Sequence, residues 1–148
     1  MIPEDDGNGR ARVQTDHPQP PLELTFPAEA AGLAPARHAM QAWLDRCAVD
    51  AEHAGDVLLA VGEACANAVE HSHRDGSAGV VRVVASVTGD DLLITVSDDG
   101  SWKHSPSAPA AHRGRGLELM RALMTEVQVH SGLSGTVVDL RTVIRPSR

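Results

Sequence analysis

The chain has 148 residues, of which 42% are hydrophobic, so it suits one ordinary globular domain and is too apolar for wholesale disorder. Its net charge of −7 and aromatic content of 2% argue against a surface that binds nucleic acid or an anionic membrane. No apolar run approaches the roughly 18 residues that span a bilayer, and the first residues hold no signal core, so we expect a cytoplasmic protein.

Residues 1–20 are rich in Pro, Gly, Asp and Gln and show no periodicity, which indicates a flexible N-terminal tail. We expect one domain over residues 21–146. The stretch 21–27 alternates apolar and polar residues, a pattern that predicts a short, half-buried strand. From about 34 to 48, apolar residues recur at steps of three and four, which predicts a helix.

A second helix is predicted over about 52–72, and its sequence separates two faces. One face is apolar: Val57, Leu58, Val61, Cys65, Ala68 and Val69. The other face is polar: Asp56, Glu63, Asn67 and Glu70. Glu63 and Asn67 stand four residues apart and are neighbours on the helix, although a solvated face is the alternative explanation for this pair. Cys47 and Cys65 both fall in apolar helical patterns, which favours buried free thiols over a disulfide.

The stretches 79–88 and 91–97 are rich in β-branched residues, and the Gly-Asp pair between them predicts a hairpin. Asp98 continues the apolar face of the second strand, so we expect its carboxylate to point inward and to need hydrogen-bond donors. Asp99 belongs to the opposite face, which favours a turn-capping role before Gly100.

A loop of about fifteen residues follows, which is long for a compact domain. A helix is predicted over about 116–126, with Gly114 and Gly116 at its start, where free N–H groups and missing side chains suit an anion. A flexible loop is the alternative for such a glycine pair alone. The stretches 127–131 and 136–145 predict a closing hairpin. Helices grouped beside a mostly antiparallel sheet make an α+β fold, a two-layer α/β sandwich with the helices on one face.

Four motifs in this order resemble one known superfamily. They are LAVGEACANAVEHS at 59–72, ITVSDDGSW at 94–102, RGRGLELMRALM at 113–124, and the pair Gly135-Thr136. Together they resemble the ATP-binding domain shared by histidine kinases, Hsp90, gyrase and MutL. Within that superfamily, the chain is most similar to the stand-alone serine kinases that act as anti-sigma factors in bacterial partner switching. The resemblance covers nearly the whole chain and implies a Bergerat-type ATP-binding fold.

The resemblance also implies roles, residue by residue. Glu63 would be the catalytic base that orients or deprotonates the attacking hydroxyl, and Asn67 would hold Mg²⁺. Asp98 would take the adenine amine, Gly100 would allow close approach, and Thr136 would support Asp98 or a bridging water. Four residues would form the phosphate-side lid and the start of the following helix: Gly114, Arg115, Gly116 and Leu117.

The implied function is transfer of the ATP γ-phosphoryl group to a serine or threonine of an anti-sigma-factor antagonist, by a homodimeric protein that also binds a sigma factor. Neither nucleic acid nor a membrane is an expected direct partner. Trp102 stands where the family carries a further glycine, so a nucleotide-gated regulator without catalysis is the alternative. A catalytic fragment of a histidine kinase is less favoured, because we expect no room for the helix pair that presents a phosphoacceptor histidine.

Overall fold

The computed structural model describes residues 19–72, 79–99, 110–132 and 135–144. Nine elements follow one another in these segments: β1 (Leu22–Pro27), the short 3-10 helix η1 (Ala30–Gly32), α2 (Leu33–Arg46), α3 (Ala51–Ser72), β2 (Val80–Thr88), β3 (Asp91–Asp98), α4 (Ala110–Leu123), β4 (Glu126–Gly132) and β5 (Gly135–Val143). The order of strands and helices predicted from the sequence is confirmed, and η1 is an addition to it.

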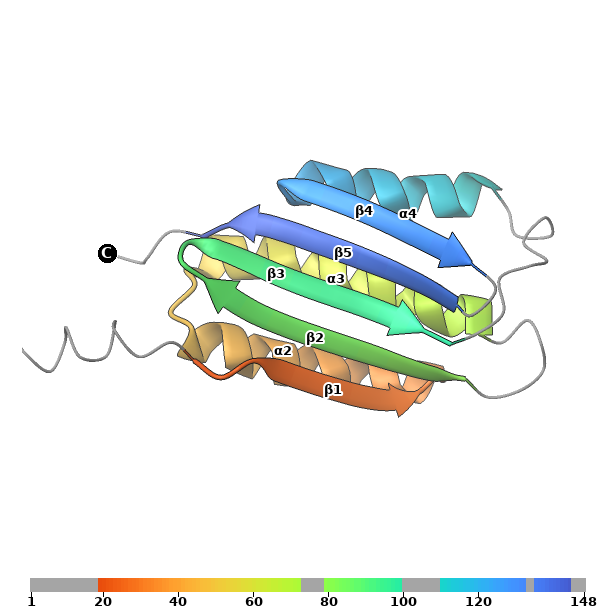
Figure 1. Ribbon diagram of the computed structural model, residues 1–148, viewed down its shortest axis with the longest axis horizontal. Helices are drawn as coiled ribbons and strands as arrows, with labels where there is room; N and C mark the ends of the chain where they lie inside the picture. The colour runs from red at the N-terminus through yellow and green to blue at the C-terminus, as the bar shows by residue number, and fades with distance from the viewer. Residues whose placement is uncertain (1–18, 73–78, 100–109, 133–134, 145–148) are drawn as a thin grey trace, which may run out of the picture.

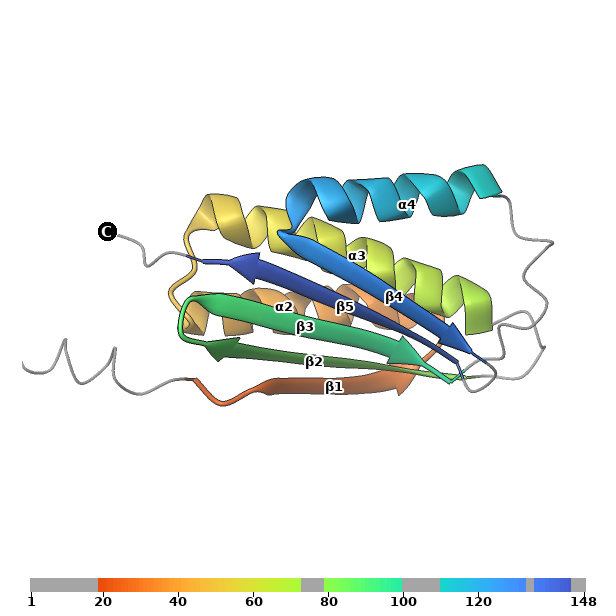
Figure 2. The same cartoon turned by 45° about the horizontal axis from the view of Figure 1, so that its top comes forward.

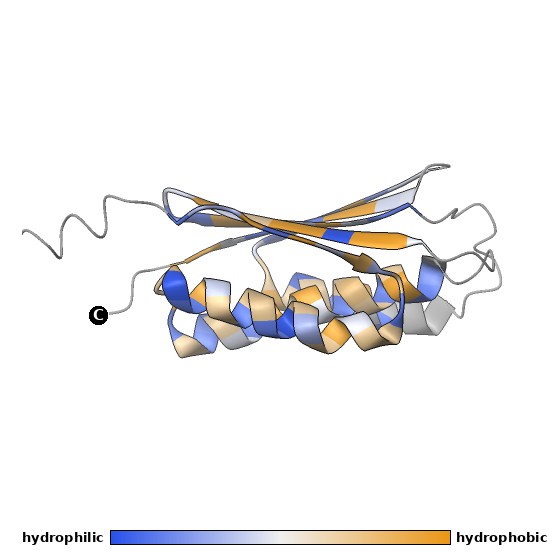
Figure 3. Cartoon of the chain, turned by 90° about the horizontal axis from the view of Figure 1, so that it is seen from below, coloured by the Kyte–Doolittle hydropathy of each residue, from blue (hydrophilic) through white to orange (hydrophobic). Residues whose placement is uncertain are grey.

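The five strands form one antiparallel sheet in the order β1-β2-β3-β5-β4 (Figure 1). The helices α2, α3 and α4 all lie against one face of this sheet, so the molecule has two layers (Figure 3). The predicted α+β sandwich with its helices on one face is therefore confirmed. The connection from β3 through α4 leads to the hairpin β4–β5, and β5 returns to pair with β3.

Alternating burial along the strands places the hydrophobic core between the two layers. In β3, Leu92, Ile94 and Val96 are buried while the residues between them are more exposed. Trp43 of α2 is also buried, and its Nε1–H donates a hydrogen bond of 2.8 Å to the Pro20 carbonyl, which satisfies the polar edge of the indole. This bond fixes the chain that enters β1 against α2.

Helix α3 is the central helix of its layer, with α2 on one side and α4 on the other (Figure 2). Every residue of the predicted apolar face is buried, and so are Ala60 and Ala64. These small side chains allow the neighbouring helices to approach α3 closely. The helix begins after Asp50, whose Oδ1 accepts a hydrogen bond of 2.8 Å from the His53 backbone N–H, as a helix N-cap does.

The outer face of the sheet is held by polar side chains. Arg141 of β5 donates to Asp91 at 2.9 Å and to Glu126 at 3.0 Å, so it links three adjacent strands. Thr95 donates to Asp139 at 2.7 Å on the same face. Within the described segments, no helix is long and apolar enough to cross a membrane.

The position of α4 corrects one prediction. The helix begins at Ala110, six residues before the predicted start at Gly116. Alanine and arginine before Gly116 favour the helical conformation, and packing against α3 compensates for the cost of about 1 kcal/mol for each interior glycine. The predicted N-terminal tail, apart from residues 19 and 20, and most of the predicted long loop lie outside the described residues.

Candidate functional site

Four segments meet at one end of the sandwich. The C-terminal half of α3 reaches this end together with the last residue of β3 and the first residues of β5 (Figure 1). Helix α4 also starts from this side and runs back beside α3. Residues that are distant in the sequence are thus brought to one end by topology alone.

Glu63 and Asn67 occupy the flank of α3 that faces α4. Both side chains are half-buried, and their spacing of four residues places them one turn apart. Gly116 of α4 lies directly against this pair. A Cβ atom added at Gly116 would be 3.1 Å from Glu63 Oε1 and 3.3 Å from Asn67 Nδ2. The structure therefore brings together three of the predicted site residues.

The surroundings of Gly116 differ from the prediction in one respect. The structure places Gly116 and Gly114 inside α4 and away from its first turn, so the free N–H groups of a helix start do not fall at these glycines. Gly116 is buried against α3, Leu117 packs against the hydrophobic core, and Arg115 is exposed. The arrangement supplies a close backbone approach at Gly116 and a cation next to it.

Asp98 and Thr136 form the second part of the site. They are partners across the β3–β5 pair, and both are buried, with 8% and 5% of their surfaces exposed. Asp98 lies on the helix-facing side of the sheet, as its alternation with Leu92, Ile94 and Val96 predicted. The Thr136 Oγ1 atom is buried without a hydrogen-bond partner in the described structure. Buried hydroxyl groups normally have a hydrogen-bond partner. A ligand or an ordered water beside Asp98 could therefore supply the partner that the Thr136 hydroxyl lacks.

Two residues that were not predicted as site residues contact the end of β3. Gly135 lies against Asp98, and Val80 bonds to Asp99. Gly135 has a positive φ of 135° and lies against the Asp98 carbonyl group. The Asp99 Oδ1 accepts a hydrogen bond of 2.8 Å from the Val80 N–H on the neighbouring strand. The glycine before Thr136 was the only sequence signal for the first contact, and no local pattern pointed to the second.

The oxygen atoms of Glu63 and Asn67 suit a hard cation whose other ligands are water and phosphate oxygens. In the described segments, no three His, Cys, Asp or Glu side chains gather in a way that could hold a metal ion. The Asn67 amide oxygen and the Glu63 carboxylate are hard oxygen donors. Mg²⁺ is commonly bound by one or two such groups together with water and phosphate oxygens, so these residues fit it.

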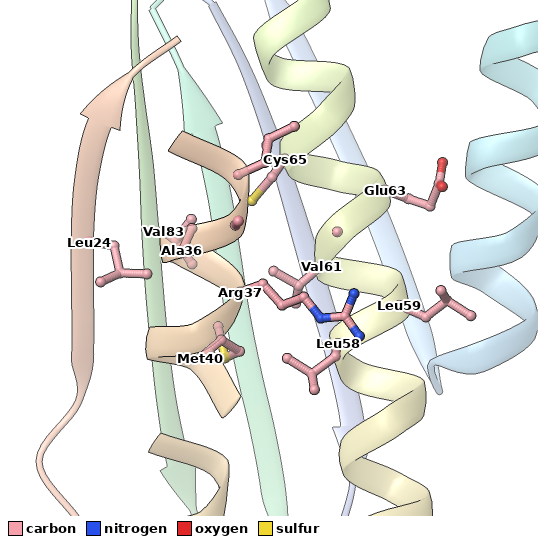
Figure 4. A pocket seen from close by; sticks show the side chains of 13 residues that line it. Leu24, Ala36, Arg37, Met40, Leu58, Leu59, Val61, Glu63, Cys65 and Val83 are labelled. Atoms are coloured by element: carbon pink, nitrogen blue, oxygen red, sulfur yellow. The ribbon is translucent and has the colours of Figure 1, made fainter. Parts of the chain in front are cut away.

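A cavity of about 290 Å³ lies elsewhere, between α2 and α3. Its lining is mostly apolar, and Leu24 and Val83 of the sheet contribute to it. Glu63 borders this cavity, but Figure 4 shows its carboxylate directed toward α4 and away from the apolar side chains. Arg37 lies between the two helices in the same view. The cavity is thus separated by α3 from the flank that carries Glu63 and Asn67.

Two residues named from the sequence lie outside the described residues. They are Gly100, for which close approach to a ligand is expected, and Trp102, which stands in place of a family glycine. His71, at the edge of the polar face of α3, is buried near the C-terminus of that helix.

Comparison with known proteins places the chain in a family. The model of the histidine kinase-like ATPase domain matches residues 26–142. The serine-protein kinase RsbW of Bacillus velezensis is 32% identical over 141 residues, which cover 86% of this chain and 88% of the relative. RsbW of Bacillus subtilis is 30% identical over 148 residues, with 84% and 92% covered.

A solved structure agrees with these sequence relatives. The crystal structure of the RsbU and RsbW domains of a Mycobacterium tuberculosis protein matches 88% of this chain with a TM-score of 0.72 and 30% identity. This chain spans 34% of that longer chain. The match of the family model, the identity of the relatives and the shared fold lead to one conclusion: the chain belongs to the histidine kinase-like ATPase domain family.

Proposed function

We propose that the protein is an ATP-dependent protein serine/threonine kinase that acts as an anti-sigma factor. Its substrate is an anti-sigma-factor antagonist, and a sigma factor is its second partner. Two curated relatives of nearly the same length carry the name serine-protein kinase, which supports this activity. We further propose that the active form is a homodimer, as the family resemblance implies.

The observation that carries the proposal is the contact of Gly116 with both Glu63 and Asn67. Here a backbone without a side chain faces a carboxylate and an amide across two helices. A general base and a cation ligand are two of the parts that phosphoryl transfer needs, and the close packing of α4 at Gly116 holds them side by side. Asp98 and Thr136, at the same end of the sandwich, supply a buried acceptor and a buried hydroxyl for a base.

In this proposal each group has one task. The Glu63 carboxylate accepts the proton of the attacking serine or threonine hydroxyl. The hydroxyl oxygen bonds to the γ-phosphorus while the bond from the γ-phosphorus to the β-phosphate oxygen breaks, and ADP leaves. The Asn67 amide oxygen would hold Mg²⁺, which would neutralise charge on the phosphates. Asp98 accepts a hydrogen bond from the adenine amine. The exposed Arg115 adds positive charge near the phosphates.

Phosphoryl transfer tests the catalytic part of the proposal. The protein is incubated with labelled ATP, Mg²⁺ and candidate antagonist proteins, and label on the antagonist is measured. Glu63→Gln keeps the shape of the side chain but removes the base, so we expect transfer to fall by at least ~100-fold while ATP binding persists. Glu70→Gln, on an exposed position of the same helix, is the matched control and should transfer normally.

The outcomes separate the two candidate functions. Tight ATP binding with no transfer by the wild type, together with regulation that survives in Glu63→Gln, would favour the regulator without catalysis. Loss of transfer in Glu63→Gln but not in Glu70→Gln supports the kinase.

Calorimetry tests the nucleotide site separately. Asp98→Asn replaces half of the acceptor with a donor that opposes the adenine amine, so we expect ATP affinity to fall about tenfold or more. Asp90→Asn, in the exposed turn at the opposite end of the sheet, should bind ATP as the wild type does. Unchanged ATP affinity in Asp98→Asn would show that the adenine ring does not bind at Asp98.

A further inference from the structure

The close contact between Gly135 and Asp98 constrains the end of β3. A Cβ atom at Gly135 would overlap the Asp98 carbonyl oxygen and would lie 3.0 Å from its carbonyl carbon and 3.1 Å from Asp99 Cα. All three atoms are backbone atoms, so they cannot move aside as a flexible side chain does. The φ of 135° at Gly135 is also one that L-residues rarely adopt. The first residue of β5 therefore has to be glycine if the Asp98 backbone keeps its place.

The other side of the same strand end is fixed by Asp99. Its Oδ1 accepts a hydrogen bond of 2.8 Å from the backbone N–H of Val80, the first residue of β2. The strand register pairs Val81 with Asp98 on this side and Thr136 with Asp98 on the other. The Asp99 carboxylate thus ties the end of β3 to β2. On the other side, the absence of a side chain at Gly135 allows the end of β3 to lie close to β5.

The consequence concerns the direction of the Asp98 side chain. Side chains alternate between the faces of a strand, so a change of backbone direction at its last residue turns that side chain away from its face. Asp98 is the last residue of β3 and has a single strand residue, Ser97, between it and the core residue Val96. Its orientation therefore depends on what holds the strand end from each side.

We propose that Gly135 and Asp99 are positioning residues that hold Asp98 in the direction needed to recognise an adenine base. This inference rests on the proposed function, because it assumes that Asp98 accepts from the adenine amine. Gly135 acts by leaving room for the Asp98 carbonyl, and Asp99 acts by anchoring the end of β3 to β2. Both residues set the affinity and base selectivity for the nucleotide without touching it.

The test at Gly135 uses glycine controls from the same sheet. Gly135→Ala should weaken ATP binding by about tenfold or more, measured by calorimetry. Gly89→Ala, in the β2–β3 turn, is also at a positive φ, of 62°, the left-handed conformation that Ala48 adopts as well, and a Cβ atom there meets no atom within 4 Å. Gly132→Ala, the register partner of Gly135, also meets no atom within 4 Å. Both controls should bind ATP with wild-type affinity.

Asp99 provides an independent variant in case Gly135→Ala does not fold. Asp99→Ala removes the acceptor for the Val80 N–H, whereas Asp99→Asn keeps an amide oxygen that can replace it. We expect Asp99→Ala to raise KM for ATP several-fold with kcat nearly unchanged, and Asp99→Asn to restore most of the affinity. Thermal melting of each variant measures any general loss of stability.

Base selectivity gives the readout that a merely structural role would not move. Guanine presents a carbonyl oxygen where adenine presents its amine, so a well-placed Asp98 disfavours GTP. In Asp99→Ala and Gly135→Ala, the ratio of GTP to ATP dissociation constants should fall toward one. If the wild type binds no ATP, the proposed function fails. If the wild type binds ATP and folded Gly135→Ala and Asp99→Ala keep its affinity and selectivity, the positioning role is wrong.

Discussion

At the scale of single residues, the missing side chain of Gly116 brings α4 against the polar flank of α3. The contact joins a helix predicted to carry phosphate-binding glycines with the helix that carries Glu63 and Asn67. Helix α3 carries Glu63 and Asn67, but only its packing with α4 adds Gly116 to them. The site is therefore a property of the packing between two elements, and it is sensitive to one methyl group.

Gly116→Ala tests that sensitivity. The added Cβ would be 3.1 Å from Glu63 Oε1, so the carboxylate must move by a few tenths of an ångström. We expect kcat for phosphoryl transfer to fall by about tenfold, because small misplacements of a catalytic group are costly. Steady-state kinetics measure the effect. Gly62→Ala, an exposed position of α3 where a Cβ meets nothing within 4 Å, is the control, and equal kcat in both variants would contradict the prediction.

At the scale of elements, α3 is the helix on which the site depends, and its start is fixed by Asp50. The backbone N–H and side chain of His53 hold the pKa of Asp50 below its ordinary value of 3.8. A carboxyl group with a lowered pKa in the folded state stabilises the protein above the ordinary pKa, and this stabilisation disappears as pH falls through the lowered one.

Asp50→Ala should therefore lower the melting temperature by about 2–4 °C at neutral pH, the size expected when a capping residue is lost. The difference between the variant and the wild type should shrink as pH falls below about 4. Asp50→Asn keeps a capping oxygen that does not titrate, and serves as the comparison. Melting curves across pH 2.5–7 measure the effect, and a difference that grows in acid would show that Asp50 does not act through its charged form.

Gly55 offers a second prediction for α3. It is exposed in the helix, and a Cβ atom there would meet nothing within 4 Å. Gly55→Ala should raise the free energy of unfolding by about 0.5–1 kcal/mol, because alanine loses less backbone entropy in a helix. Urea denaturation measures the change through its midpoint. A lower midpoint would mean that Gly55 has a contact outside the described residues.

At the scale of the whole molecule, one face of the sheet is buried against the helices and the other carries polar side chains. The inner face and the three helices enclose the core, and the outer face carries the Arg141 network and the Thr95–Asp139 hydrogen bond.

Burial raises the pKa of Cys65 to about 12, so this thiol forms almost no thiolate while the protein is folded. The pKa of the half-buried Cys47 is raised for the same reason.

Thiol labelling at neutral pH therefore reports the opening of the whole domain. In a Cys47→Ser background, Cys65 should react with a thiol reagent only when the core opens, so its rate should rise steeply with urea concentration. Electrospray mass measurements give the labelled fraction over time. A fast rate that does not depend on urea would show that Cys65 is reached from the cavity between α2 and α3, whose lining includes it.

Much of the fold could be predicted because the decisive patterns are local. The alternation in β3 placed Asp98 on the inner face, and the polar positions of α3 placed Glu63 beside Asn67. The start of α4 could not be predicted, because glycines that disfavour a helix by themselves are retained when the helix packs against α3. Asp99 was expected to cap the turn before Gly100, and only the register of β2 showed that Val80 is its partner.

The sequence by itself determined the order of the elements, the buried face of each, and the four motifs that indicate an ATP-binding domain, since all of these depend on spacings along one stretch of chain. Only the tertiary structure decided that Gly116 lies on Glu63 and Asn67, and that Gly135 lies on the Asp98 carbonyl. These contacts join residues more than thirty positions apart in the sequence. They depend on how helices and strands pack against each other, which no local spacing encodes.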